Sequence, residues 1–244
     1  MRNTTIKSLF TLGIIALSIN PQAHADDKNG LSGSGELGFS DSTGNTVNTS
    51  FYGALKLKYT QERYTLKSLI EANYKSENGT QTEERYLIDL QGNRYYSADK
   101  SYYSFVGGRF EKNEFSDIEL DSTFSLGLGK TLYKTEATLL NGELGLGYQN
   151  TDYVTDGVKS DSQTVGIAKL DFSHKINEQV KFTQDFAITS GENNTKLESN
   201  TGFKVKVAEK MNLKATYKYR HNDNPATGTK KTDTQTILTL IYDF

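Results

Sequence analysis

The chain lacks most of the residue types that build covalent staples and reactive centres. Its 244 residues include no cysteine and no tryptophan, only two prolines and only three histidines. Without cysteine the chain can form neither a disulfide scaffold nor a thiolate metal site or nucleophile. A formal net charge of −2 gives no basic surplus of the kind that nucleic-acid binding needs, so no nucleic-acid partner is expected. Beyond the N-terminal segment, no stretch approaches the roughly 18 consecutive apolar residues that predict a spanning helix.

The first 25 residues have the pattern of a cleavable export signal. Arg2 and Lys7 are basic, residues 9–19 are mostly apolar, and Ala23-His24-Ala25 has the A-x-A pattern of a cleavage site. A retained membrane anchor is the less favoured alternative, because a spanning helix needs about 20 apolar residues. We therefore predict a signal peptide over 1–25, export from the cytoplasm, and one mature domain over 26–244.

What the chain has in abundance is alternation of apolar and polar residues. The clearest case is a run in which Ile118, Leu120, Phe124, Leu126 and Leu128 alternate with polar residues. A period of two predicts β-strands with one apolar and one polar face. The mature chain contains about twelve such runs. In residues 101–112 the pattern does not fix which face is apolar.

The predicted connections fall into two classes in chain order. The tight ones lie near 60–63, 97–100, 134–135, 177–179 and 208–210. The others lie near 76–84, 113–117, 150–161 and 222–231 and are mostly longer, although those near 41–45 and 191–194 are short. This arrangement is typical of outer-membrane barrels, whose strands escape hydropathy scans because only alternate residues face lipid. The sequence thus predicts an all-β, antiparallel up-and-down transmembrane β-barrel of about twelve strands in a Gram-negative outer membrane, with both termini in the periplasm.

The closing residues, TQTILTLIYDF, form an amphipathic strand that ends on an aromatic residue. Leu240, Tyr242 and Phe244 in this strand resemble the C-terminal signal by which bacterial outer-membrane proteins reach the barrel insertion machinery. That machinery and outer-membrane lipid are therefore expected partners. Because a barrel can have no open edge in lipid, the last strand must pair with the first. Other outward-phase aromatic residues form two predicted belts, with Tyr133 one residue out of phase.

Residues of the opposite phase would line the interior, and many of them are charged. We expect lysines toward the periplasmic ends of the strands and carboxylates toward the outer ends, so that the interior is basic below and acidic above. The predicted interior lysines are Lys56, Lys58, Lys67, Lys181, Lys204, Lys206 and Lys214. The predicted interior carboxylates are Glu71, Asp89, Glu119, Asp121, Glu143, Glu198 and Asp233.

Three functions are compatible with this pattern. Charge rings in an open, porin-like interior would bias which small ions or hydrophilic solutes pass. In a closed structural or surface-interaction barrel, opposite charges would pair and fill the interior, as side chains do in barrels of about eight strands. The third alternative is a soluble periplasmic β-sheet protein that binds a ligand. No catalytic, cofactor or metal site is predicted, because the two mature histidines, His174 and His221, fall at opposite ends of the strands.

Two segments resemble a known family. They are STGNT, residues 42–46, and GGRFEKNEFSDIELDSTFSLGLGKTL, residues 107–132. Both are similar to segments of the YdiY-like salt-induced outer-membrane proteins, a bacterial family of unknown function. The resemblance implies an outer-membrane β-barrel and suggests a link to osmotic or salt stress. Gly129-Lys130 departs from the Gly-Tyr expected after the glycine-rich strand, and the family offers no active site to carry over.

Overall fold

The structure is a computed structural model that describes residues 29–42, 48–226 and 229–244. The predicted signal peptide and part of the first predicted connection lie outside these residues. The strands are β1 (Gly30–Ser42), β2 (Asn48–Thr60), β3 (Tyr64–Glu77), β4 (Thr80–Tyr95), β5 (Tyr102–Asn113), β6 (Ile118–Lys134), β7 (Thr138–Tyr153), β8 (Asp161–Lys175), β9 (Val180–Gly191), β10 (Thr195–Lys206), β11 (Met211–Asn222) and β12 (Thr232–Asp243).

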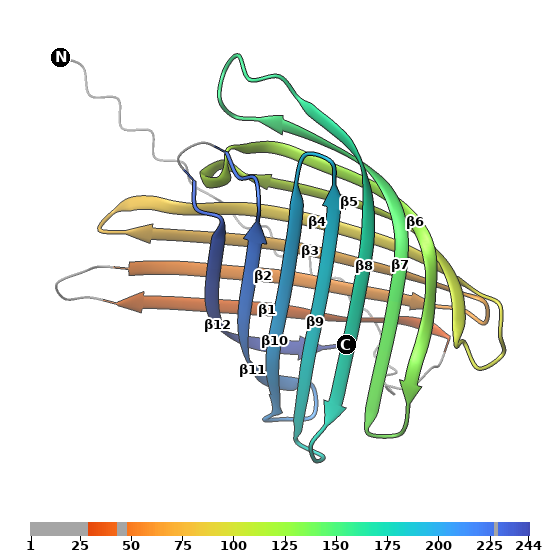
Figure 1. The fold of residues 1–244 in the computed structure, drawn as a ribbon. Helices are drawn as coiled ribbons and strands as arrows, with labels where there is room; N and C mark the ends of the chain where they lie inside the picture. The colour runs from red at the N-terminus through yellow and green to blue at the C-terminus, as the bar shows by residue number, and fades with distance from the viewer. Residues whose placement is uncertain (1–28, 43–47, 227–228) are drawn as a thin grey trace.

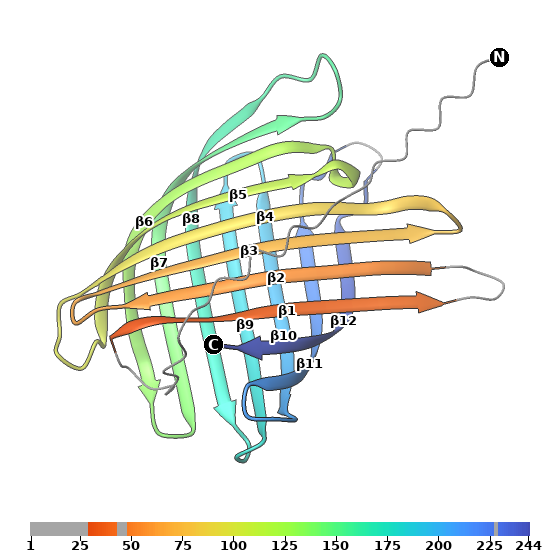
Figure 2. The ribbon, with the colours of Figure 1, turned by 180° about the vertical axis from the view of Figure 1, so that it is seen from behind.

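The twelve strands form one closed antiparallel barrel, in which each strand pairs with its neighbours in the chain and β1 also pairs with β12. Figure 1 and Figure 2 show its two opposite walls. This confirms the predicted all-β up-and-down barrel. We call the end that holds Gly30 and Asp243 the terminal end, and the end that holds Ser42 and Thr232 the distal end.

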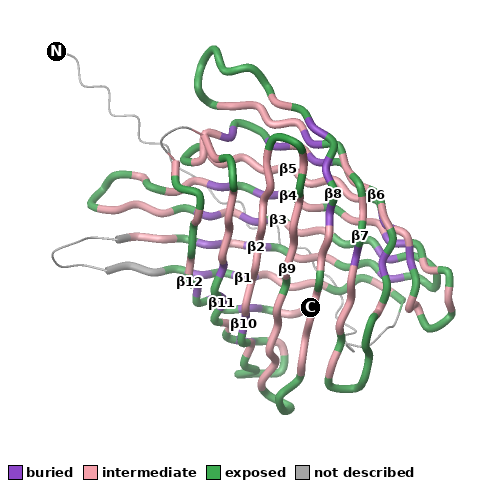
Figure 3. Tube along the Cα trace, viewed as in Figure 1, coloured by how far each residue is buried: buried purple, intermediate pink, exposed green. Residues whose placement is uncertain are grey.

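The outer face is apolar and the inner face is polar. On β6 the outward side chains of Phe124, Leu126 and Leu128 are exposed, whereas the inward side chains of Asp121 and Thr123 are buried. Figure 3 shows exposed positions alternating with less exposed ones along the strands. Large apolar side chains are exposed in the same way on most of the strands, which is the pattern of barrels whose outer face contacts lipid.

Aromatic side chains lie outward at both ends of the barrel. Tyr59, Tyr64 and Tyr242 are exposed near the terminal end, and Phe39 and Tyr148 near the distal end. Tyr133 also faces outward, although its position in the sequence is one residue out of phase. The reason is a register shift between Thr131 and Tyr133, which inserts one extra residue into β6.

The connection predicted over 76–84 is wrong. β3 and β4 continue through most of these residues and meet at a tight turn over Asn78 and Gly79, both of which have positive φ, 51° and 79°. An Asn-Gly pair is suited to such a hairpin turn because both residues tolerate positive φ. Among the described residues the only helix is the 3-10 turn η1 (Glu114–Ser116), and no helix there is long or apolar enough to cross a membrane.

The seam between β1 and β12 is the shortest ladder of the barrel. It runs only from Ser34↔Asp243 to Leu37↔Leu240, with two further hydrogen bonds between Gly33 and Phe244 of 2.8 and 2.9 Å. By contrast, β1 pairs with β2 along its whole length. Toward the distal end β12 bends away from β1 (Figure 1). The distal part of the seam therefore lacks the backbone ladder that joins every other pair of neighbouring strands among the described residues.

Inside the seam, side chains replace part of the missing ladder. Ile237 of β12 forms a buried apolar cluster with Tyr52 and Ala54 of β2, so the contact passes over β1. Gly38 of β1 leaves the room for it, since a Cβ there would lie 3.3 Å from the Ile237 side chain. Packing thus holds together strands that the backbone does not join.

Candidate functional site

A chain of ion pairs centred on Arg85 crosses the interior in its distal half. The guanidinium of Arg85 donates two hydrogen bonds to Glu111, at 2.8 and 2.9 Å, and one to Glu71 at 2.7 Å. The Arg85 side chain is only 2% exposed. Two parallel N–H···O bonds fix both the position and the plane of the guanidinium, which a single contact would not do. Strands β3, β4 and β5 are thereby tied together on the inside.

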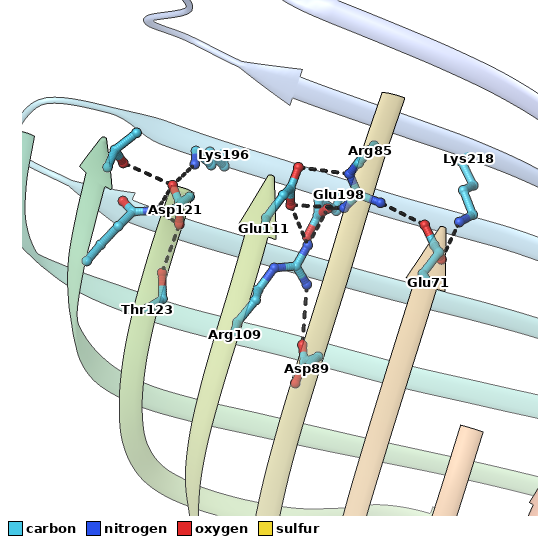
Figure 4. A network of polar contacts seen from close by, with 12 residues as sticks. Glu71, Arg85, Asp89, Arg109, Glu111, Asp121, Thr123, Lys196, Glu198 and Lys218 are labelled. Carbon is cyan, nitrogen blue, oxygen red and sulfur yellow. Dashed lines mark hydrogen bonds and ion pairs between the residues drawn. The ribbon is translucent and has the colours of Figure 1, made fainter. Parts of the chain in front are cut away.

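Arg109 and Lys218 extend this chain to the opposite wall, as Figure 4 shows. Arg109 of β5 donates to Glu198 of β10 at 2.9 Å and to Asp89 at 3.3 Å. Lys218 of β11 donates to Glu71 of β3 at 2.7 Å. We give the name constriction network to the residues that these ion pairs join, which are Glu71, Arg85, Asp89, Arg109, Glu111, Glu198 and Lys218. Because it joins strands that are not neighbours in the sheet, it occupies the interior itself.

A second bridge lies beside the constriction network. Asp121 of β6 accepts from Lys196 of β10 at 2.5 Å, and also from Gln149 and Thr151 of β7 (Figure 4). A cavity of about 130 Å³ lies among these side chains, lined by Arg109, Asp121, Lys196 and other residues. The cavity lining is mostly polar and charged, and ion pairs such as Lys196–Asp121 and Arg109–Glu198 cross the interior beside it. These bridges narrow the distal half of the interior.

Aromatic side chains line the inner wall on the terminal side of the constriction network. Tyr103 and Phe105 of β5 are buried, and the hydroxyl of Tyr103 donates to Glu143 of β7 at 2.9 Å. Both rings lie against glycines: a Cβ on Gly145 would be 2.8 Å from the Phe105 ring, and a Cβ on Gly129 would overlap the Tyr103 ring. The glycine-rich sequence of β6 and β7 thus provides room for bulky residues of β5.

The terminal half of the interior is more open. Lys58, Lys67 and Asp185 have the inward phase and are nevertheless exposed. Lys56 pairs here with Glu36 at 2.6 Å, and Lys204 pairs with Asp243 at 2.6 Å. Strand β9 has no buried residue along its length, and Figure 3 shows it in the intermediate and exposed colours. We call this solvent-accessible part of the interior the vestibule.

The predicted interior residues divide between these two regions. The inward phase of the vestibule contains Lys56, Lys58, Lys67, Lys181, Lys204, Lys206 and Lys214, and the distal and middle parts contain Glu71, Asp89, Asp121, Glu143 and Glu198. Glu119 is a correction: the register shift between Ile118 and Leu120 leaves its side chain 54% exposed, where it accepts from Lys112 of the outward phase.

The distal half is also less acidic than we expected. Arg85, Arg109 and Glu111 were absent from the predicted set, and the two arginines neutralise carboxylates that we expected to form an acidic ring. Continuing the alternation backwards from Tyr86 would have placed Arg85 inside. Pairing residues 101–112 with the preceding strand would have placed Arg109 opposite Asp89, as the register shows.

The two histidines make structural hydrogen bonds. The Nδ1 atoms of His174 and His221 each lie 2.8 Å from a threonine hydroxyl on the neighbouring strand, at opposite ends of the barrel. Among the described residues, no group of three or more His, Cys, Asp or Glu side chains could hold a metal ion.

A closed sheet with an apolar exterior and a charged interior defines a transmembrane β-barrel of the outer-membrane type. Residues 35–244 match a family described as "Protein of unknown function, DUF481", and the chain belongs to this family. It is 22% identical over 219 residues to "Uncharacterized protein YdiY" of Escherichia coli (strain K12), covering 89% of this chain and 85% of that protein. The resemblance to YdiY-like proteins is thereby confirmed.

Solved structures with the same fold are outer-membrane proteins. An outer membrane channel from Pseudomonas putida F1 has a TM-score of 0.55 and 13% identity, over 93% of this chain and all of that one. The NanC porin has a TM-score of 0.52 and 12% identity, over 87% of this chain and 98% of that one. The autotransporter NalP translocator domain from Neisseria meningitidis has a TM-score of 0.50 and 16% identity, over 90% of each chain. These similarities place the fold among outer-membrane barrels in contact with lipid.

Proposed function

We propose that the protein is a narrow, non-enzymatic passage for small ions and hydrophilic solutes, with the terminal end in the periplasm. One observation carries this proposal: a solvent-accessible, charged vestibule leads to a constriction made of side chains, not of backbone. Exposed side chains change rotamer within nanoseconds, and Arg109, whose side chain is 30% exposed, can exchange partners while the backbone wall stays closed. The channel and porin named above have the same fold, which is compatible with this proposal.

A closed structural or surface-interaction barrel is the second candidate. The burial of Arg85 between two glutamates favours it, because a buried charge paired on both sides is costly to displace. The third alternative, a soluble periplasmic ligand-binding protein, is disfavoured by the apolar outer face.

We retain the link to salt or osmotic stress as a proposal. Growth of a deletion strain at high salt tests it.

Single-channel conductance of the refolded protein in a planar bilayer tests the passage. We expect stable conductance steps, and we expect Arg109→Ala to raise the conductance because it removes the side chain that joins β5 to β10. Lys112→Ala is the matched control, since Lys112 lies three residues further along β5 and faces outward. A folded protein that never conducts, even with Arg109→Ala, would favour the closed barrel.

Export is proposed on the basis of the N-terminal pattern alone. We propose that residues 1–25 are removed, so that Asp26 becomes the first residue of the mature protein. N-terminal sequencing of protein from the outer-membrane fraction should begin at Asp26. Recovery of the uncleaved chain from the membrane would instead indicate a retained N-terminal segment.

A further inference from the structure

Four lysines lie side by side on the inner wall of the vestibule. The strand register pairs Lys175 of β8 with Lys181 of β9, Lys181 with Lys204 of β10, and Lys204 with Lys214 of β11. Directly opposed residues on neighbouring strands project from the same face, with Cβ atoms about 4.5–5.5 Å apart. These four residues, which we call the lysine row, therefore lie in one continuous line across four adjacent strands.

The lysine row also leads inward from the mouth. Lys175 is the last residue of β8, Lys181 the second of β9, Lys204 the third from the end of β10, and Lys214 the fourth of β11. Each lysine is thus one residue further from the terminal end than the one before it. Lys218, a member of the constriction network, lies two steps beyond Lys214 along the inner face of β11, with Thr216 between them.

This arrangement is unfavourable for folding. Like charges placed directly opposite each other destabilise a sheet, and the lysine row contains three such pairs in succession. Lys204 is compensated by Asp243 at 2.6 Å. Within the part of the chain that the structure describes, Lys175, Lys181 and Lys214 make no ion pair within 4.0 Å. Asp171 and Asp185 share the same wall and oppose each other, and Asp185 together with Glu36 offsets part of the positive charge of Lys214.

We propose that the lysine row is a binding site for small multivalent anions, such as phosphates or polycarboxylates, that enter from the terminal end. Lysine binds phosphate and carboxylate groups as a point charge, so a line of lysines suits a ligand with several anionic groups in sequence. This inference rests on the proposed function, because a site in the vestibule would determine which class of solute the passage selects. The anion moves along the row toward Lys218 and the arginines of the constriction network.

Binding is measured with inorganic tripolyphosphate and the refolded full-length mature protein in detergent micelles, by isothermal titration calorimetry. The test variant carries Lys181→Gln, Lys204→Gln and Lys214→Gln. We expect its dissociation constant for tripolyphosphate to rise at least about fivefold, given the modest strength of each exposed ion pair. The control variant carries Lys130→Gln, Lys210→Gln and Lys230→Gln, an equal change of charge outside the row, and should bind like the wild type.

The reversal potential in a planar bilayer under a salt gradient gives an independent readout. We expect anion selectivity in the wild type and a shift toward cation selectivity in the test variant alone. Removing like-charge repulsion should offset the loss of the ion pair between Lys204 and Asp243, so the unfolding temperature of the test variant should change little. Lys181→Gln alone serves if the triple variant does not fold. Tripolyphosphate binding to a protein that never conducts would contradict the proposed passage and still support the anion-binding site. A test variant with wild-type affinity and reversal potential would overturn the inference.

Discussion

Replacing Arg85 with methionine is expected to lower the free energy of unfolding by about 3–5 kcal/mol, because it leaves buried carboxylates without their shared cation. Glu111 would lose two hydrogen bonds and Glu71 would lose one. Methionine fills a similar length but donates no hydrogen bond. Glu71 would keep its contacts with Lys218 and the Tyr52 hydroxyl, whereas Glu111 would keep only the longer contact with Arg109 at 3.4 Å and must find water or a proton in a narrow interior. This is the largest single-site effect that we expect in the constriction network.

Urea unfolding in lipid vesicles measures this effect, with tyrosine fluorescence as the signal because the chain has no tryptophan. Arg85→Lys should lose less stability than Arg85→Met, since lysine keeps the charge but not the two-bond geometry. Adding Glu111→Gln to Arg85→Met should restore part of the loss. Arg94→Met on the exposed side of β4 is the matched control, with a change within about 0.5 kcal/mol. Wild-type stability of Arg85→Met would contradict a structural role for the network.

Gly33→Val is expected to prevent closure of the barrel, whereas Gly35→Val on the same face of the same strand should fold normally. A Cβ on Gly33 would lie 2.7 Å from the backbone oxygen of Lys56 and 2.8 Å from the Phe244 ring, while a Cβ on Gly35 meets nothing within 4 Å. Overpacking and the loss of the hydrogen bonds to Phe244 together cost about 3 kcal/mol. The seam has few other backbone contacts to compensate.

The fraction of heat-modifiable protein after refolding into vesicles measures closure. Refolding in pure lipid contains no insertion machinery, so a defect there comes from the seam itself. Phe244→Ala in the same assay separates the two roles proposed for that residue, since a defect confined to cells would arise from recognition. Equal refolding of Gly33→Val and Gly35→Val would show that the contact between Gly33 and Phe244 does not limit closure.

The sequence alone was enough to predict the barrel, because lipid and the interior impose opposite requirements on successive residues. Every strand inherits this alternation, so runs such as Phe124, Leu126 and Leu128 indicate both a strand and its outer face. The last strand and its partner followed from the need to leave no edge unpaired in lipid. The hairpin at Asn78-Gly79 was missed because polar residues near a rim have the same composition in a strand as in a loop.

The interior was harder to predict, because facing the inside does not specify a partner. Glu71 and Glu198 were placed correctly on their strands, yet the residues that pair with them are distant in the sequence. Arg109 was not predicted as an interior residue, because its strand has glycines at positions 107 and 108 and therefore shows no clear apolar–polar alternation. Glu119 was misplaced by a single extra residue, and no periodicity reveals such a bulge.

The short seam makes the two leaflets of the membrane unequal for this protein. The ladder between β1 and β12 ends at Leu37↔Leu240, although the same register continued would join Ser42 to Gln235. Backbone groups without a ladder partner are costly in hydrocarbon and must reach headgroups or water. We therefore expect the thickness and packing of the leaflet around the distal half to control how tightly this barrel stays shut, while the other leaflet meets a continuous wall.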